Sequence, residues 1–477
     1  MNASTGPHPL KGVDMPSWLI RYDEHGACTS VQTRAALLDR LHSAPPSDIV
    51  LFSHGWNTGL EDAASLYTQF LRHFEALLAA HPPSRRFDPL FVGVLWPSIW
   101  LSFESGPAIA SGGADALGAA GSLIGELAER IAAAVGTAGL ARVYALLAAP
   151  AINDADAAEL ARLIAPAFGV IADEGAAAQG RDTVAEDVLA MMHAMEATQP
   201  GVDAAQPFDF DDFSRPVHAG DASDAGAAGS AGALPGQPRA AGASAWLDPR
   251  HALRLFSLYQ MKDRAGAVGF NGVAALLRDL LAIAGAPGIG ASTVAPARVH
   301  AVGHSFGCKV LLSAICAAPL PRPLASLLLM QPAVSHLCFA DAVPDTAKPG
   351  GYRDALSADR VLAPIFSTYS CQDFPLHDTF HLALRRASDL GEAQIAGEPG
   401  STSAGAPPSR YASLGGYGPR RAGQVLIDPL PPAGTAVPLP KDGVPIVAFD
   451  GSQGLVQGHG DVTGPALAWL LRELMFR

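Results

Sequence analysis

Short apolar runs alternate with longer segments of helical periodicity along most of this chain. The runs DIVLFS (48–53) and PLFVGVLWPS (89–98) lack polar alternation, which is typical of strands buried on both faces of a parallel sheet. Between them, residues 61–80 place apolar side chains at helical spacing. This order of strand, helix and strand predicts a unit of a parallel α/β sheet.

The same criteria predict elements along the rest of the chain. Strands are expected over 17–23, 297–303, 325–335, 361–370 and 444–452, and helices over 31–42, 249–284, 305–318 and 463–477. Alternation of strands and helices over the whole chain predicts the α/β class, with a mostly parallel, doubly wound sheet.

Composition shifts divide the chain into a core and excursions from it. Residues 1–105 and 246–477 carry the strand–helix pattern, whereas 106–202, after the WPS strand, are Ala-rich and predicted to be a helical insertion that could serve as a cap. Residues 203–245, rich in Asp, Gly, Ala and Pro, are expected to be a flexible loop, and 393–440 a loop-rich excursion.

Charge and cysteine content exclude several protein classes. Of 477 residues, 49% are hydrophobic, and the net charge of −13 argues against nucleic-acid binding. The five cysteines form no C-x-x-C pair, which suits a reducing compartment.

The first residues contain no apolar signal-peptide core, so we expect a cytoplasmic protein. Residues 106–127 form the longest low-charge stretch, and a membrane anchor there is an alternative that we regard as disfavoured.

Residues 303–307 read Gly-His-Ser-Phe-Gly and match G-x-S-x-G, the pattern of a nucleophile elbow. The pattern alone is weak in a chain with 49 glycines. Its context is stronger, because an apolar strand precedes Ser305 and a helix follows it. Gly303 and Gly307 would permit the tight turn that raises a serine above the sheet edge, with His304 as a supporting residue.

A serine nucleophile that transfers an acyl group also needs two N–H groups directed at the developing oxyanion. We expect one from Phe306, directly after the serine. The second is expected from Trp56, in the HGWN loop that follows the strand 48–53. His54, Gly55 and Asn57 would support this loop.

The general base should follow the serine and the acid in the chain. His459, in the loop between the last strand and the last helix, is the candidate, because His336 precedes the expected acid. His377 and His381 are four residues apart, as in metal sites, but a third ligand is not evident nearby. We therefore do not expect a metal at this pair.

The acid should lie just after the strand 361–370. Asp373 is the first carboxylate there, and Asp378, five residues later, is the second choice. A carboxylate in this role orients the histidine and stabilises its protonated form.

Five segments together resemble the α/β-hydrolase superfamily: HGWN after a strand, VLWPS, GHSFG, SCQDFPL, and HGD before a C-terminal helix. They are similar, more narrowly, to a little-characterised bacterial branch with an HGWN loop, a WPS strand end and a GHS-x-G elbow. The resemblance implies Ser305 as nucleophile, Asp373 as acid, His459 as base, and Trp56 and Phe306 as oxyanion donors. It also implies hydrolysis without a metal or cofactor. It covers 48–98, about 255–335, 361–380 and 444–477.

The leading hypothesis is a serine hydrolase that cleaves a carboxylic ester of a lipid-like or other apolar acyl group. A peptidase, amidase or thioesterase would use the same residues. A different class is a non-catalytic protein of this fold that binds a partner through the insertion. The sequence does not indicate the oligomeric state.

Overall fold

The computed structural model describes residues 6–56, 58–98, 120–168, 188–189, 192–193, 247–283, 296–344, 348–362, 364–380, 410–438 and 443–477. Its centre is an eight-stranded sheet with the order β1-β3-β2-β4-β5-β6-β8-β7, in which each pair of neighbouring strands is parallel. The predicted α/β class and parallel sheet are confirmed. The strands are β1 (Ser17–Arg21), β2 (Asp48–Ser53), β3 (Pro89–Leu95), β4 (Arg298–His304), β5 (Ser326–Met330), β6 (Ile365–Tyr369), β7 (Val425–Ile427) and β8 (Ile446–Asp450).

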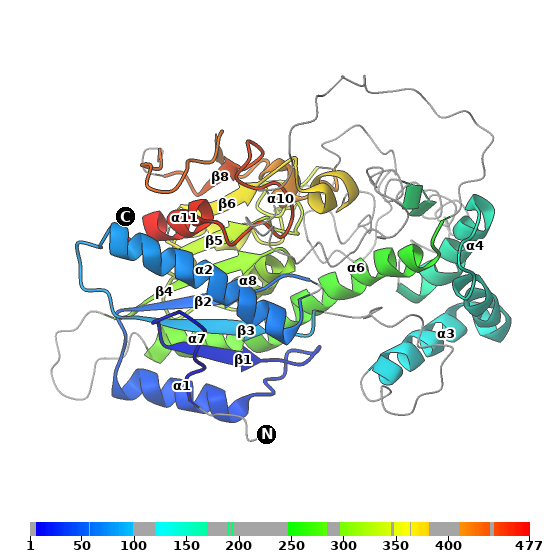
Figure 1. Cartoon of the computed structure of the whole chain (residues 1–477), viewed down its shortest axis with the longest axis horizontal. Coiled ribbons are helices and arrows are strands. Elements are labelled where there is room, and N and C mark those ends of the chain that lie inside the picture. Colours follow the sequence, from blue (N-terminus) through cyan, green and yellow to red (C-terminus); the bar gives the residue numbers. More distant parts are fainter. Residues whose placement is uncertain are drawn as a thin grey trace, which may run out of the picture.

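Helices cover both faces of this sheet (Figure 1). Helices α2 (Leu60–Ala80) and α11 (Pro465–Met475) share one hydrophobic cluster with one face. Helices α1 (Val31–Ser43), α7 (Ala274–Ile283) and α8 (Phe306–Cys316) pack in a second cluster on the other face. The central strands β2, β4 and β5 are buried along nearly their whole length, as the unalternating apolar runs predict.

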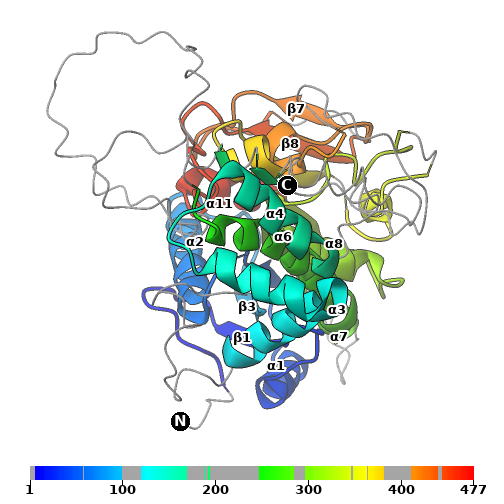
Figure 2. The ribbon, with the colours of Figure 1, turned by 90° about the vertical axis from the view of Figure 1, so that its right-hand side faces the viewer.

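The described residues between β3 and β4 are mostly helical. Figure 2 shows α3 (Ala120–Leu147) and α4 (Asp154–Ile164) beside α6 (Arg250–Ala267). Ile131 and Leu160 of the insertion share a buried cluster with Met261 of α6, so the insertion packs against the helix that leads back into the core. Residues 106–119 of the predicted insertion, the loop predicted over 203–245 and residues 393–409 of the predicted excursion lie outside the described residues.

Several strand and helix ends differ from the sequence expectation. Strand β5 ends at Met330 rather than 335, because Gln331 has a φ of 43° and Pro332 has no N–H to donate to a neighbouring strand. Strand β6 begins at Ile365, directly after Pro364. A π-helical segment, Val268–Val273, interrupts the helix predicted over 249–284. Strand β7, within the segment expected to be loop-rich, is not predicted at all.

Two helices in the described ranges are long and apolar enough to span a membrane by length and composition. They are Ala128–Leu147, of which 17% is buried, and Gln260–Ile283, of which 50% is buried. Helices packed in the core of soluble proteins meet the same criterion, so this is weak evidence for a membrane protein. Neither coincides with the stretch 106–127 considered from the sequence.

Candidate active site

Strands β2 and β4 are neighbours at a point where the chain reverses the direction in which it adds strands. Strand β3 lies on one side of this pair and β5 on the other. In such sheets, ligands bind outside the carboxyl ends of the strands at this switch point. Ser53 pairs with Gly303, so the HGW loop after β2 and the Ser305 turn after β4 leave the sheet side by side.

Ser305 occupies a sharp turn between β4 and α8, with φ 55° and ψ −127°. Such a conformation is strained for a residue with a side chain, and close packing of both flanking glycines accompanies it. A Cβ on Gly303 would lie 2.8 Å from Cys308 Cα, and one on Gly307 would lie 2.1 Å from the carbonyl oxygen of Ser53. The G-x-S-x-G pattern thus has the geometry of an elbow.

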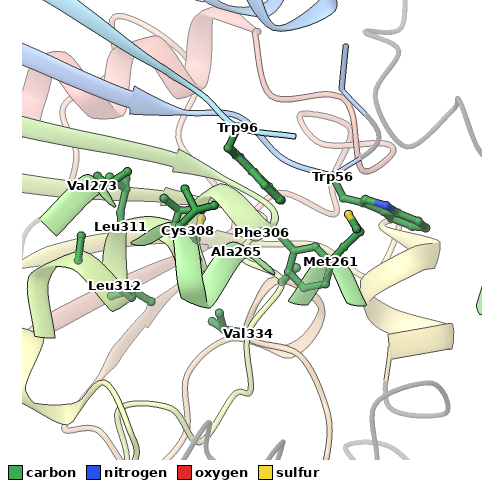
Figure 3. Close-up of a cluster of buried hydrophobic side chains, with 14 of the residues drawn as sticks. Trp56, Trp96, Met261, Ala265, Val273, Phe306, Cys308, Leu311, Leu312 and Val334 are labelled. Atoms are coloured by element: carbon green, nitrogen blue, oxygen red, sulfur yellow. The ribbon is translucent and has the colours of Figure 1, made fainter. Parts of the chain in front are cut away.

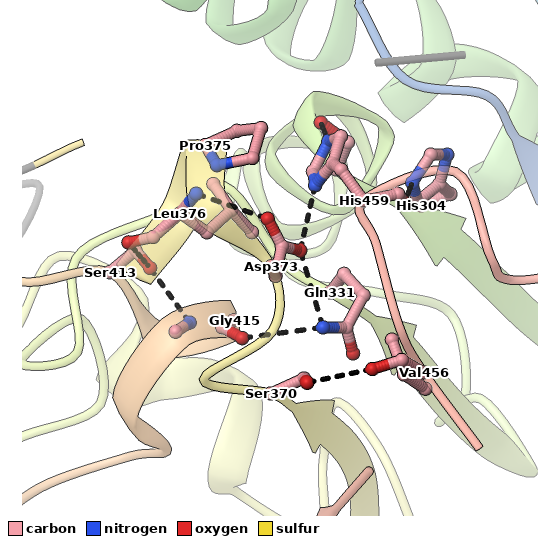
Figure 4. A network of polar contacts seen from close by, with 12 residues as sticks. His304, Gln331, Ser370, Asp373, Pro375, Leu376, Ser413, Gly415, Val456 and His459 are labelled. Atoms are coloured by element: carbon pink, nitrogen blue, oxygen red, sulfur yellow. Dashed lines mark hydrogen bonds and ion pairs between the residues drawn. The ribbon is translucent and has the colours of Figure 1, made fainter. Parts of the chain in front are cut away.

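Ser305, His459 and Asp373 come from three separate loops but are in hydrogen-bond contact. Figure 4 shows the contact of His459 with Asp373. His459 Nε2 lies 2.8 Å from Ser305 Oγ, and His459 Nδ1 lies 2.8 Å from Asp373 Oδ2. All three side chains are buried. Because the carboxylate accepts a hydrogen bond from Nδ1–H, Nε2 is left to accept the serine proton.

Asp373 is completely buried, and two further donors hold its carboxylate. The backbone N–H of Leu376 donates to Oδ1 at 3.1 Å, and Gln331 Nε2 donates to Oδ2 at 3.3 Å. Asp378, the second-choice acid, lies elsewhere: its carboxylate is 3.3 Å from His377 Nδ1 and 49% exposed. Gln331 was not identified from the sequence. The one sequence signal for it is its place in SLLLMQP (326–332), where a polar residue stands between an apolar run and a proline.

His304 supports the loop that carries His459. Its Nε2–H donates to the carbonyl oxygen of His459 at 2.9 Å. Burial, reinforced by the neighbouring His459, holds the pKa of His304 well below its usual value. His304 is therefore a neutral donor, which fits the role of a supporting residue and not that of a second base.

The HGW loop lies directly against Ser305. A Cβ on Gly55 would come within 2.7 Å of Ser305 Cβ, so only glycine permits this approach. Phe306 is the first residue of α8, where N–H groups have no partner within the helix. Trp56 follows Gly55 and lies in the hydrophobic cluster that contains Phe306. Asn57 lies outside the described residues.

The conformation of this loop depends on His54, whose imidazole is buried. Its Nδ1–H donates to the carbonyl oxygen of Gly55 at 2.9 Å, and its Nε2 accepts the Trp96 backbone N–H at 3.3 Å. Burial lowers the pKa of His54 to about 4. The neutral ring joins the loop after β2 to the chain after β3, as expected of a supporting residue.

Apolar side chains surround the start of α8. Figure 3 shows Trp56, Met261 and Phe306 within one hydrophobic cluster. Met261 and Phe306 are at most 2% exposed, and Trp56 is 7% exposed. The backbone on either side of Ser305 is therefore held in a hydrophobic cluster.

Within the described ranges, three or more His, Cys, Asp or Glu side chains nowhere gather as a metal site would require. His377 stacks on Tyr417, with ring centroids 4.4 Å apart, and His381 lies outside the described residues.

Comparisons of the chain with protein-family models, with curated proteins and with solved structures find no match.

Proposed function

We propose that this protein is a serine hydrolase of the α/β-hydrolase type that cleaves carboxylic esters through an acyl-enzyme. The observation that carries the proposal is the contact of His459 with both Ser305 Oγ and Asp373 Oδ2, at 2.8 Å each. The strained Ser305 turn, and the order of serine, acid and histidine along the chain, support the same assignment.

In the acylation step, Ser305 Oγ attacks the ester carbonyl carbon while its proton passes to His459 Nε2. Asp373 stabilises the imidazolium that forms. The backbone N–H groups of Phe306 and Trp56 stabilise the oxyanion. The tetrahedral intermediate then collapses, the bond from carbon to the alcohol oxygen breaks, and His459 donates its proton to the departing alcohol.

In the deacylation step, water replaces the alcohol. His459 Nε2 takes a proton from the water, whose oxygen attacks the acyl carbon of the ester on Ser305. The bond to Ser305 Oγ then breaks, Oγ regains its proton from His459, and the carboxylic acid leaves. The apolar surroundings formed by Trp56, Phe306 and Met261 favour an apolar acyl group over a charged one.

A fluorophosphonate probe tests the proposal, because it modifies activated serines. We expect labelling of Ser305, identified by peptide mapping, in the native protein but not after denaturation or in Ser305→Ala. Hydrolysis of p-nitrophenyl esters of increasing chain length, compared with matched anilides and thioesters, then identifies the bond cleaved. A native protein left unlabelled would contradict the proposal and favour a partner-binding protein of this fold.

A further inference from the structure

Gln331 adopts a backbone conformation that residues other than glycine rarely adopt. It follows β5 directly, is completely buried, and has a φ of 43°. Among the described residues, Ser305 and Arg421 are the only others besides glycine with positive φ. Strain of this kind persists only where surrounding contacts impose it, and it concentrates at functional sites.

Hydrogen bonds determine which way the Gln331 amide faces. Thr368, on β6, accepts the backbone N–H of Gln331 at 3.1 Å and donates its hydroxyl proton to Gln331 Oε1 at 2.7 Å. Nε2 is thereby turned toward the acid loop. There it donates to Asp373 Oδ2 at 3.3 Å and to the carbonyl oxygen of Gly415 at 3.4 Å (Figure 4).

The same turn also holds the backbone of Ser305. Ser305 N–H donates to the carbonyl oxygen of Met330 at 3.1 Å, and Ala333 N–H donates to the carbonyl oxygen of Ser305 at 3.2 Å. Gln331 lies between Met330 and Ala333, the two residues that make these contacts. One turn therefore contacts the backbone of the serine and the carboxylate of the acid.

We propose that Gln331 is a positioning residue for Asp373; this inference rests on the proposed function. Its Nε2–H donates to Asp373 Oδ2, the same oxygen that accepts the hydrogen bond from His459 Nδ1–H, and this fixes the rotation of the carboxylate. Gln331 itself touches neither the serine hydroxyl nor the oxyanion position, so it acts through the acid.

Gln331→Asn is the informative variant. Asparagine tolerates positive φ better than glutamine, so the fold should persist, but its amide is one methylene too short to reach Asp373. We expect the rate constant for fluorophosphonate labelling of Ser305 to fall about 10- to 100-fold, the range for loss of one hydrogen bond to a charged group. The thermal midpoint should fall by a few degrees at most, so that the protein remains folded under the conditions of the assay. Thr368→Val, which removes the hydroxyl that orients the amide, should reduce the rate in the same direction.

A pH profile separates positioning from a structural role. Gln331→Glu replaces the amide donor with a second carboxyl group beside Asp373, and two buried carboxyl groups in contact do not both ionise easily. The acid limb of the labelling rate should therefore move to higher pH. A purely structural role would leave this limb in place. Arg421→Gly is the matched control, since it relieves a φ of 55° outside this network, and its labelling rate should equal that of the wild type.

Wild-type labelling rates in Gln331→Asn, or an unmoved acid limb in Gln331→Glu, would overturn the role of Gln331 while leaving the proposed function intact. A rate loss in Gln331→Asn that matches its loss of folded protein would also overturn it. A wild-type protein that is not labelled at Ser305 would overturn the proposed function, and this inference with it.

Discussion

Trp96 stacks on His54, with ring centroids 5.6 Å apart and planes inclined by 12°. The Trp96 indole Nε1–H also donates to the carbonyl oxygen of His54 at 3.0 Å. Ser98 continues this contact: its hydroxyl accepts the Thr58 N–H at 3.0 Å and donates to the Thr58 carbonyl oxygen at 2.8 Å. Residues 96–98 are thus hydrogen-bonded to the chain on both sides of Trp56, and we expect these bonds to set the position of the Trp56 N–H.

Trp96→Phe should reduce catalysis through this loop. The phenyl ring retains most of the stacking on His54 but removes the donor to its carbonyl oxygen. We expect kcat for ester hydrolysis to fall about tenfold, and the free energy of unfolding to fall by about 1 kcal/mol, the usual contribution of one hydrogen bond. Hydrolysis kinetics and urea unfolding measure the two effects.

Trp18→Phe is the control for this substitution. The indole nitrogen of Trp18 is buried and lacks a hydrogen-bond partner within the described structure. Its loss should therefore leave kcat unchanged. Equal losses of kcat in both variants would show that the effect of Trp96→Phe comes from general loosening of the core.

His54 should make the protein acid-sensitive. Its pKa is about 4 in the folded protein against 6.5 for the free side chain, because burial opposes its charge. The unfolded chain takes up a proton first, so the stabilisation is complete above pH 6.5 and is lost as the pH falls toward 4. The shift corresponds to roughly 3 kcal/mol.

Urea unfolding at intervals from pH 7.5 to about pH 4, the range set by this shift, should therefore show a shallower slope of stability against pH in His54→Gln than in the wild type. His304 and His336 are also buried with lowered pKa values, so both proteins will lose stability in acid. The difference between the two slopes gives the contribution of His54. Identical slopes would contradict a lowered pKa of His54 in the folded protein.

Much of the site follows from local sequence because local contacts produce it. Gly303 and Gly307 flank a serine between a strand and a helix, and the tight turn needs all of these features. Asp373 could be preferred over Asp378 because it is the first carboxylate after β6. Each of these inferences depends on residues close together in the chain.

Other features depend on partners that are distant in the sequence. In the sequence, Gln331 is simply the residue that follows a strand. Its contacts with Thr368 and Asp373 exist because β6 pairs with β5. Strand β7, with three residues, is too short to show a periodicity and exists because β8 supplies its hydrogen bonds. Periodicity reports which face of an element is buried, but not which polar groups meet there.

Asp373→Asn and Asp378→Asn should separate the two candidate acids. Asparagine at 373 presents an amide to His459 and favours the wrong tautomer, so kcat should fall about 10⁴-fold. Asp378 contacts His377 and not His459, so its substitution should leave kcat near the wild-type value. Hydrolysis of one p-nitrophenyl ester by both variants measures this, and the opposite ranking would refute the assignment of Asp373.

Asp48 should stabilise the fold from the other end of the sheet. Its buried carboxylate accepts hydrogen bonds from Arg85 at 2.7 and 2.8 Å and from His300 at 3.0 Å. Burial opposes its ionisation, but the bonds from His300, Arg85 and Ser47 outweigh this and hold the pKa of Asp48 well below its usual range. Asp48→Asn should lower the free energy of unfolding by about 3 kcal/mol at neutral pH.

The pH dependence of that effect follows from the direction of the shift. A lowered folded pKa gives stability that is present above the unfolded value of about 3.9 and is lost as the pH falls through the folded one. The difference in the free energy of unfolding between the wild type and Asp48→Asn should therefore become smaller in strong acid. Asp88→Asn removes an exposed contact with Arg86, 3.5 Å long, and should change the stability little at any pH. A comparable loss in this control would show that the buried network has no special role.

Gly55→Ala should inactivate the site without removing any of its functional groups. The added Cβ would lie 2.7 Å from Ser305 Cβ and 3.2 Å from His304 Nδ1, so the HGW loop must move away from the serine. Removing one oxyanion donor costs about 10²- to 10³-fold in kcat, and displacement of the Trp56 N–H should cost a similar factor. Gly464→Ala is the control, since a Cβ there meets nothing within 4 Å. Labelling of Ser305 and ester hydrolysis should both fall in Gly55→Ala and persist in Gly464→Ala. Undiminished hydrolysis by Gly55→Ala would mean that the loop after β2 does not supply the oxyanion donor.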